Sequence, residues 1–228
     1  MGVERSLVRE RGEGSPETTR DMETDKKWVI VRIDGKIAAI STDYRMLAEI
    51  SARIASEGQG KKAGKDRKSP LYDKITAETV PFGQVWKLRE NIAWDDFILF
   101  GTDFQKKVWR KLWELTHGDL SDTSQETEED MKLICYSDFA GLCENKAGVR
   151  AVAHAIGLNP ISVIIPCHLV IPKESIDKIN EIKRKAEATI FKGDDLCLKS
   201  ILDDSSIDFG EYALGKKLKR ELIKMEHA

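Results

Sequence analysis

The neighbouring residues Cys167 and His168 follow an apolar run that begins at Ile161, and together they could carry out nucleophilic chemistry. A thiol reacts as the thiolate, and a nearby imidazole can take its proton or stabilise its charge. Adjacent residues of an extended strand point to opposite faces, so the two side chains need a turn to cooperate. Pro166, whose ring holds φ at about −65°, can supply that turn. The pair alone leaves a second interpretation open, because free cysteines are often buried and inert.

A longer pattern leads to this pair and runs without a gap over residues 134–170. It contains, in order, Tyr136, Arg150-Ala151-Val152 and Asn159-Pro160. The pattern resembles that of the O6-alkylguanine-DNA alkyltransferases, in which an RAVG.A…NP helix precedes a PCHRV site. Upstream, residues 101–109 are similar to the family's GT.FQ..VW motif. The matches cover roughly residues 100–226 and are interrupted by two insertions.

The resemblance implies DNA repair in which Cys167 accepts an alkyl group from guanine O6 in one displacement, with no cofactor. The thioether product has no route back to a thiol, so each molecule would react once. His168 would be the base, acting in the family through an intervening water. Residues 209–215 resemble the family's GNYSGG loop, and counting along the next helix brings Glu226 to the position of the family's glutamate. A carboxylate there would orient the imidazole. The alternative for Glu226 is a solvated residue on a Lys-rich helix.

Two further residues receive catalytic roles from the resemblance. Tyr136 would donate its phenol proton to the leaving guanine, and its alternative is an ordinary aromatic residue at a helix start. Asn159 precedes Pro160, which disfavours the helical region for it. In the family this asparagine is the hinge between the recognition helix and the active-site strand, and its side chain orders the turn around the cysteine. For Asn159 the structural and functional interpretations coincide.

The expected partner is double-stranded DNA containing O6-alkylguanine, bound by a monomer. One predicted helix is rich in small residues and could approach a minor groove closely, although small residues also permit close helix packing. These residues are Gly148, Ala151, Ala153, Ala155 and Gly157. Arg150 resembles the arginine that fills the gap left by a flipped nucleotide. Flipping is required because O6 must reach a buried sulfur. The predicted DNA contacts are Gly148, Arg150, Ala151 and Tyr136.

The chain departs from the family pattern around the predicted substrate pocket. That pocket is expected to be formed by Pro166, Val170, Tyr212, Ala213 and Leu214. Ala213 stands where the family has a serine, which removes a hydrogen-bonding group. Leu214 stands in place of a glycine and is expected to narrow the pocket, and Leu169 replaces an arginine after the Pro-Cys-His motif. These changes put the range of alkyl groups in doubt, not the nucleophile.

Composition fits an intracellular protein. The 228 residues carry a net charge of −2, so any DNA-attracting surface must be local. No apolar run approaches the roughly 18 residues that span a membrane, and no membrane association is expected. The four cysteines show no metal or disulfide spacing, so we expect no metal site and a reducing compartment. By function the compartment would be the nucleus of a eukaryote, and otherwise the cytoplasm.

The first part of the chain reads as a small domain. Residues 1–26 are polar and predict a disordered lead-in. Residues 27–95 predict an α+β domain, because two strand-like runs flank the Asp34-Gly35 turn and helical spacing follows from Asp43 to Ile54. A Gly- and Lys-rich linker is expected over 59–70, and residues 71–88 are expected to return to the sheet.

Residues 100–228 predict a mainly helical domain with insertions near 118–131 and 171–209. Thr102 or Asp103 can cap a helix that extends to Leu115. The other expected helices span residues 137–143, 147–156, 176–190 and 215–226, and 119–130 reads as an acidic loop. The second and third helices suit a helix-turn-helix.

The predicted fold is therefore α+β, with a small N-terminal sheet-plus-helix domain and a mainly helical C-terminal domain that carries a winged helix-turn-helix-like DNA-binding unit. Two other functions stay open. One is a non-enzymatic protein that recognises alkylated DNA on the same fold, against which the presence of Cys167 argues. The other is a Cys-His hydrolase unrelated to DNA, which leaves the match over residues 134–159 unexplained.

Overall fold

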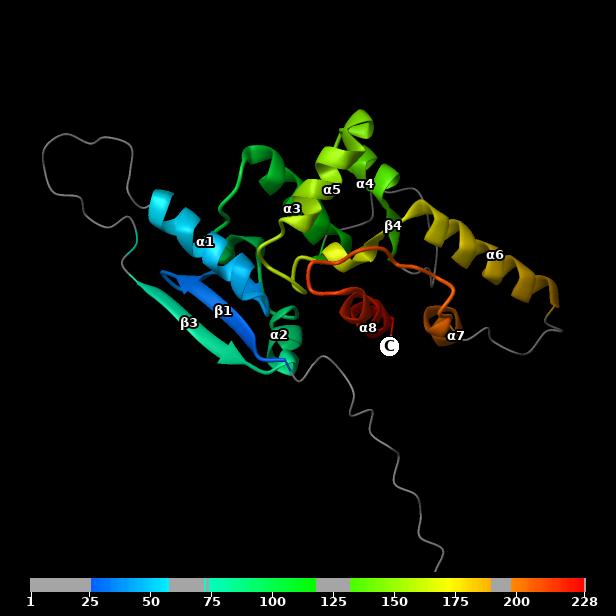
Figure 1. Ribbon diagram of the computed structural model, residues 1–228, viewed down its shortest axis with the longest axis horizontal. Coiled ribbons are helices and arrows are strands. Elements are labelled where there is room, and N and C mark those ends of the chain that lie inside the picture. The colour runs from blue at the N-terminus through cyan, green and yellow to red at the C-terminus, as the bar shows by residue number, and fades with distance from the viewer. Residues whose placement is uncertain (1–25, 58–71, 73, 118–131, 190–197, 228) are drawn as a thin grey trace, which may run out of the picture.

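A three-stranded antiparallel sheet begins the part of the chain that the computed structural model describes, which is residues 26–57, 72, 74–117, 132–189 and 198–227 (Figure 1). Its strands are β1 (Trp28–Ile33), β2 (Lys36–Ser41) and β3 (Ile75–Val80), in the order β2-β1-β3. Asp34 and Gly35 join β1 to β2 with φ values of 48° and 85°. Two positive φ angles in a two-residue loop match the twist of antiparallel strands, which confirms the predicted hairpin.

The central strand β1 packs against other elements on both faces, since its alternate residues point to opposite sides. Val31 and Ile33 pack with α1 (Tyr44–Glu57), whose apolar residues include Leu47. Ile30 points the other way and joins the main core together with α2 (Phe82–Leu88). The sheet therefore belongs to two hydrophobic clusters, and the one that contains α2 continues into the C-terminal half.

Only part of residues 71–88 returns to the sheet, which corrects the prediction. The strand ends at Val80, and Pro81 follows it with extended backbone angles (φ −70°, ψ 156°). Proline has no N–H to continue a strand ladder and is well placed just before a helix. Helix α2 accordingly starts at Phe82 and brings Arg89 to its C-terminal end.

The C-terminal half is mainly helical, as predicted. Helix α3 (Asp103–His117) starts with a reciprocal cap in which the Gln105 N–H donates to the Thr102 hydroxyl and the Thr102 N–H donates to the Gln105 side chain. Such a capping box satisfies two free N–H groups, which confirms Thr102 as the cap. A short 3₁₀ segment, η2 (Trp94–Asp96), lies between α2 and α3.

Two short helices lead to the Cys-His motif, and the second of them packs on α3. They are α4 (Tyr136–Leu142) and α5 (Val149–Gly157), separated by the 3₁₀ turn η4 (Lys146–Gly148). Their existence confirms the two predicted helices, whereas the winged helix-turn-helix assignment stays a prediction. A parallel two-stranded pairing joins β4 (Ile134–Cys135) to β5 (Val170–Ile171), so the start of α4 lies next to the segment after the motif.

The second insertion forms a small core of its own. Helix α7 (Leu198–Asp203) lies beside the last helix, α8 (Lys216–Glu226), and helix α6 (Lys173–Thr189) packs into the same apolar cluster (Figure 1). Their shared apolar cluster contains Ile171, Ile179, Ile201, Leu202, Ile207, Phe209 and Ile223. Arg220 of α8 connects this helix to the end of α7 by donating hydrogen bonds to the carbonyls of Leu202 (2.6 Å) and Asp204 (3.0 Å). The insertion therefore braces the helix that carries Glu226.

Several predictions fall outside the described residues. These are the disordered lead-in, the Gly- and Lys-rich linker and the acidic loop of residues 119–130. Among the helices that are described, none is both long and apolar enough to cross a membrane.

Candidate active site

A tight turn presents Cys167. Pro166 has φ −81° and ψ 60°, and the Cys167 N–H donates to the Ile165 carbonyl at 2.8 Å. These angles are those of an inverse γ-turn, and they place the cysteine at the start of the 3₁₀ turn η5 (Cys167–Leu169). The turn predicted at Pro166 is thus present. Cys167 is 8% exposed, and His168 is fully buried.

Asn159 holds this turn together from the end of α5. Its side-chain amide donates to the Ile165 carbonyl (2.8 Å) and to the Cys167 sulfur (3.2 Å), and its oxygen accepts the Ile161 N–H (3.0 Å). Pro160, which follows it, keeps the chain out of the helical region here. Asn159 therefore connects the end of one helix, the turn and the sulfur.

The Cys167 thiol experiences opposing influences on its pKa. Burial raises the pKa, while the hydrogen bond from Asn159 and the positive charge of Lys219 act in the opposite direction. Burial favours the neutral thiol, and a donor or cation beside the sulfur favours the thiolate. The net direction is upward, so the free protein holds a protonated thiol that needs a base.

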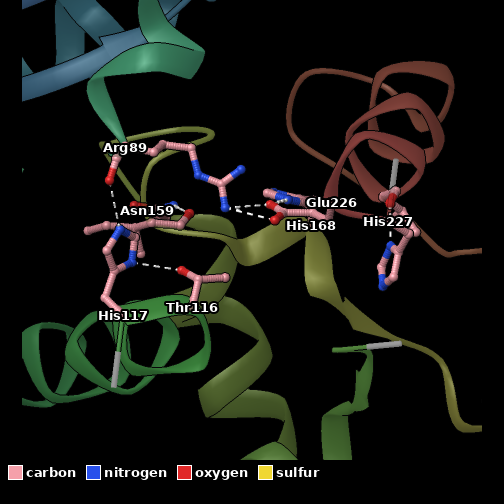
Figure 2. A network of polar contacts seen from close by, with 9 residues as sticks. Arg89, Thr116, His117, Asn159, His168, Glu226 and His227 are labelled. Atoms are coloured by element: carbon pink, nitrogen blue, oxygen red, sulfur yellow. Dashed lines mark hydrogen bonds and ion pairs between the residues drawn. The ribbon is translucent and has the colours of Figure 1, made fainter. Parts of the chain in front are cut away.

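His168 and Glu226 form a buried pair. The imidazole Nε2 lies 2.8 Å from Oε1 of the carboxylate (Figure 2). Burial lowers the pKa of His168 despite the neighbouring carboxylate, so the ring is neutral near pH 7. Burial opposes ionisation of Glu226, but hydrogen bonds from His168 and Arg89 outweigh it and lower the pKa to about 2. Since an ionised carboxylate only accepts, Nε2 carries the proton and Nδ1 keeps its lone pair.

The free nitrogen of His168 is suited to accept a proton. Nδ1 is buried and has no hydrogen-bond partner among the described residues. Within that part of the chain, Nδ1 makes no direct hydrogen bond to the Cys167 sulfur, so transfer of the thiol proton through an intermediary stays a prediction. A proton taken up on Nδ1 would create an imidazolium whose other N–H already faces an anion.

A cavity of about 310 Å³ opens in front of the sulfur. Its lining comes from the end of α5, the Cys-His turn and the loop before α8, and comprises Tyr136, Ala153, Ile156, Gly157, Asn159, Ser162, Cys167, Glu211, Tyr212 and Ala213. Of the predicted pocket residues, Tyr212 and Ala213 lie in this lining. Pro166, Val170 and Leu214 do not; they are buried in or beside the core. Leu214 packs into the main core, so its position does not support the expected narrowing of the pocket.

Both tyrosines of the cavity retain their protons. Burial raises the pKa of Tyr136, and the neighbouring Cys167 and Glu211 add to this. Burial raises the pKa of Tyr212 well above its ordinary value, again with a contribution from Cys167. A phenol that keeps its proton can serve as a hydrogen-bond donor to a bound group.

Lys219 is a functional candidate that sequence reasoning missed. It is 1% exposed, and its ammonium donates to the Val170 carbonyl (2.8 Å) and the Glu211 carbonyl (3.3 Å). The ammonium also lies 5.9 Å from the centre of the Tyr136 ring. Burial lowers the pKa of Lys219 to about 8, although the nearby Cys167 acts in the opposite direction. The available signal was helical spacing, since Lys219 and Glu226 are seven residues apart and share a face with Leu222.

Arg89 is the second residue that was missed. Its guanidinium pairs with Glu226 at 2.7 Å, across 137 positions of the sequence. No neighbouring residue or spacing in the sequence indicates that this arginine, at the end of a short helix, pairs with a distant carboxylate. The pairing could therefore not be predicted from the sequence.

Three of the four predicted DNA-contacting residues lie on α5 or just before it, whereas Tyr136 lies at the start of α4 and lines the cavity. Arg150 and Ala151 are exposed, together with His154 and Gly157 on the same side of the helix. Arg150 makes no hydrogen bond or ion pair within the described ranges, so its side chain is available to a partner. Gly148 has a packing reason as well, because a Cβ there would come within 2.4 Å of the Asn145 side chain.

Comparison with known proteins gives one family match. Residues 129–188 match the model of the 6-O-methylguanine DNA methyltransferase, DNA binding domain. A probable methylated-DNA–protein-cysteine methyltransferase of Acanthamoeba polyphaga mimivirus is 40% identical over 80 residues, which are 35% of this chain and 45% of that protein. The protein named methylated-DNA–protein-cysteine methyltransferase in Shigella flexneri is 34% identical over 107 residues, 44% of this chain and 54% of the relative. The chain thus spans about half the length of these curated relatives.

Solved structures are similar at a lower level. The O6-methylguanine-DNA methyltransferase of the archaeon Pyrococcus kodakaraensis is 18% identical, with a TM-score of 0.41 over 89% of this chain and 92% of that one. A Mycobacterium tuberculosis OGT solved in complex with DNA is 24% identical, with a TM-score of 0.32 over 57% of this chain and 53% of that one.

Proposed function

We propose that this chain, whose residues 129–188 match the model of the 6-O-methylguanine DNA methyltransferase, DNA binding domain, repairs DNA by moving an alkyl group from guanine O6 to Cys167. One observation carries the proposal. A buried sulfur, hydrogen-bonded by Asn159, lines a cavity of about 310 Å³ at the end of a helix whose other face is exposed. This arrangement suits a reaction on a base that has left the helix stack and entered a pocket.

The first step forms the nucleophile. The Cys167 thiol loses its proton to Nδ1 of His168, through a water as the family resemblance implies, and Glu226 stabilises the resulting imidazolium. The thiolate is then held by the side-chain amide of Asn159 and by the charge of Lys219. Each of these groups favours the charged over the neutral sulfur, which offsets part of the cost of burial.

The second step is a single displacement. The thiolate attacks the alkyl carbon, a carbon–sulfur bond forms, and the bond between that carbon and O6 breaks. Its electron pair leaves with the guanine, which takes a proton from the Tyr136 phenol, and Tyr136 regains a proton from the imidazolium through solvent. The protein ends with a thioether and the DNA with an unmodified guanine. Since a thioether does not revert to a thiol, each molecule reacts once.

The proposed substrate is double-stranded DNA bound by a monomer along α5. Small residues at Gly148 and Ala151 permit close approach to a groove, and Arg150 extends from the same exposed side. Arg150 is proposed to occupy the space left by the flipped nucleotide. Extrusion of the base costs a few kcal/mol, so a side chain that fills the gap would favour the open state.

The direct test is to incubate the protein with a duplex that contains one O6-methylguanine and to measure the mass of the intact protein. We expect one added methyl group, located on Cys167 by peptide mapping. Cys167→Ala should accept none while still binding the duplex, because the thiol supplies chemistry and not phosphate contacts. Cys143→Ala, which removes another buried thiol, is the matched control and should be methylated normally. Methylation of Cys167→Ala at normal yield would refute the assignment.

The same experiment separates the alternative function. A protein that recognises alkylated DNA without repairing it would bind the methylated duplex more tightly than the unmodified one and gain no mass. A mass gain on Cys167 excludes that alternative.

A further inference from the structure

We propose that Arg89 is a positioning residue for the His168–Glu226 pair, so that the N-terminal unit of the protein helps to set the geometry of the reaction site. The inference rests on the proposed function and adds a residue to it. Arg89 itself touches neither the sulfur nor the cavity lining, and it would act only through Glu226.

The contact between Arg89 and Glu226 is close and largely shielded from solvent. Nη2 of the guanidinium lies 2.7 Å from Oε1 and 2.8 Å from Oε2, and the two side chains are 11% and 8% exposed. Oε1 is also the atom that faces Nε2 of His168 at 2.8 Å (Figure 2). One carboxylate is therefore held between a permanent cation and the imidazole, and it has little freedom to rotate away.

Arg89 is itself held in place by residues of α2 and α3. Its guanidinium lies 4.3 Å from the centre of the Trp86 ring, a cation–π distance. Its carbonyl oxygen lies 3.2 Å from Nε2 of His117, whose Nδ1 is 2.8 Å from the Thr116 hydroxyl. Because a carbonyl only accepts, His117 donates through Nε2 and accepts from Thr116 through Nδ1.

The support extends one layer further, to aromatic residues of the main core on α3. The His117 ring is stacked on Trp113 with centroids 3.5 Å apart and planes 8° from parallel. Burial lowers the pKa of His117, so the stacked ring is neutral near pH 7. A chain of contacts thus runs from the aromatic residues of α3 through the Arg89 backbone to the carboxylate.

This arrangement has a chemical consequence. The hydrogen bonds from His168 and Arg89 keep Glu226 ionised despite its burial, and an ionised Glu226 keeps the proton of His168 on Nε2. Nδ1 is then free to accept the thiol proton. If Arg89 were absent, the buried carboxylate would bind a proton more readily or turn toward solvent, and the imidazole would lose its orientation.

The test compares Arg89→Met and Arg89→Lys with wild type. Transfer rates are measured with the methylated duplex and with free O6-benzylguanine, from about pH 5 to pH 9. We expect Arg89→Met to react about 100-fold more slowly with both substrates, as is typical when a reacting group is misplaced by about 1 Å. Arg89→Lys keeps the charge without the planar geometry and should recover about tenfold of that loss.

The pH profile distinguishes positioning from a general structural role. The titratable or charged groups that act on Glu226 are His168 and Arg89, and Glu226 in turn interacts with His117. Those that act on His168 are Glu226, Arg89 and Lys219. Loss of the cation raises the pKa of Glu226, so the activity of Arg89→Met should begin to fall at a higher pH than that of wild type as the solution is acidified. A purely structural role would lower the fraction of active protein without moving the profile.

Arg110→Met is the matched control. Arg110 also lies over a tryptophan, 4.9 Å from the Trp94 ring centre, and also pairs with a glutamate, Glu114. It has no contact with Glu226, so its removal should leave rate and profile unchanged. If Arg89→Met does not fold, Arg89→Lys carries the test, and a wild-type rate and profile in that variant would overturn the proposal.

A second readout separates this inference from the proposed function. Alkylation of Cys167 by iodoacetamide, followed by peptide mapping, needs the same proton acceptor but no DNA. If wild type accepts no methyl group from DNA, the proposed function fails, and Arg89 is still judged by whether Arg89→Met shifts the pH dependence of this alkylation. An Arg89→Met profile identical to that of Arg110→Met would refute the role of Arg89.

Discussion

Asn159 follows the end of helix α5 and contacts the candidate nucleophile, so its backbone and its side chain each have a role at the site. The sequence predicted its place at the end of a helix from Pro160, and the family resemblance predicted that it orders the turn around the cysteine. The structure adds the atoms: the amide donates to the Cys167 sulfur at 3.2 Å and to the Ile165 carbonyl at 2.8 Å. The Cys167 sulfur therefore accepts a hydrogen bond that would be lost if Asn159 were replaced by a side chain of equal size without an N–H group.

Replacing Asn159 by Asp tests that dependence with almost no change in volume. The carboxylate can still accept the Ile161 N–H, but it cannot donate to the sulfur, and its charge opposes formation of a thiolate. We expect the pKa of Cys167 to rise and transfer to slow by about tenfold or more, with the optimum moved to higher pH. Asn145→Asp, on the turn before α5, is the control and should react normally. The thiol titration and the transfer rate measure the effect; an unchanged thiol pKa would mean that Asn159 serves the backbone alone.

The residues that sequence reasoning missed share a physical cause. Arg89 acts through a partner 137 positions away, and Lys219 lies on a helix whose composition suggests a solvated surface. Motifs report local spacing, whereas the Arg89 contact arises only when the two halves of the chain pack together, and the Lys219 contact with Val170 arises only when α8 packs against the segment after the Cys-His turn. Cys167 and Asn159 lie within one short segment, so their proximity could be predicted.

Elements that are specified by a few neighbouring residues were predicted correctly from the sequence. The Asp34-Gly35 hairpin and the capped start of α3 depend on a few adjacent residues, and both were predicted. The core shared by α6, α7 and α8 was not predicted, because it depends on which distant surfaces these helices meet. The end of β3 at Val80 was also missed, although the local signal for it, Pro81, stands in the sequence. The sequence indicated a helix in the second insertion but not that the insertion braces α8.

Helix α3 positions α5 through one buried hydrogen bond. The Trp109 indole N–H donates to the Ala155 carbonyl at 2.8 Å, and both residues lie in the main core. Because α5 ends at the hinge before Cys167, this bond links the core to the reaction site. Sequence reasoning placed Trp109 on a helix but could not identify its acceptor.

Trp109→Phe should therefore destabilise the protein by about 2–4 kcal/mol, because it removes a buried hydrogen bond to the Ala155 carbonyl, which keeps the Leu158 N–H as a donor, and leaves a cavity beside it. Trp94→Phe is the control, since Trp94 is only half-buried and makes ring contacts in the aromatic cluster. We expect it to cost about 1 kcal/mol. Urea unfolding measures both, and equal losses would show that the indole hydrogen bond contributes little.

At the scale of the whole molecule, the site brings three ionisable groups out of water in one place. Glu226 and Lys219 lie on α8, and His168 lies on the facing turn. Burial lowers the pKa of Lys219 to about 8 and that of His168 below its usual value, while the partners of Glu226 lower its pKa to about 2. The net charge of −2 predicts none of this, because it describes the surface average and not the interior.

The burial of Lys219 leads to a specific prediction of how the free energy of unfolding depends on pH. Its pKa is about 8 in the folded protein and 10.5 when exposed, so between these values the unfolded chain binds more protons and stability rises with pH. Below about pH 8 the lysine is charged in both states and the full cost of burial applies. Relative to Lys219→Met, wild type should therefore gain about 2–3 kcal/mol in unfolding free energy between pH 8 and pH 10. The exposed Lys217→Met is the control and should follow wild type. Urea unfolding at each pH gives the difference, and a difference that stays constant across this range would mean that Lys219 keeps its ordinary affinity for a proton.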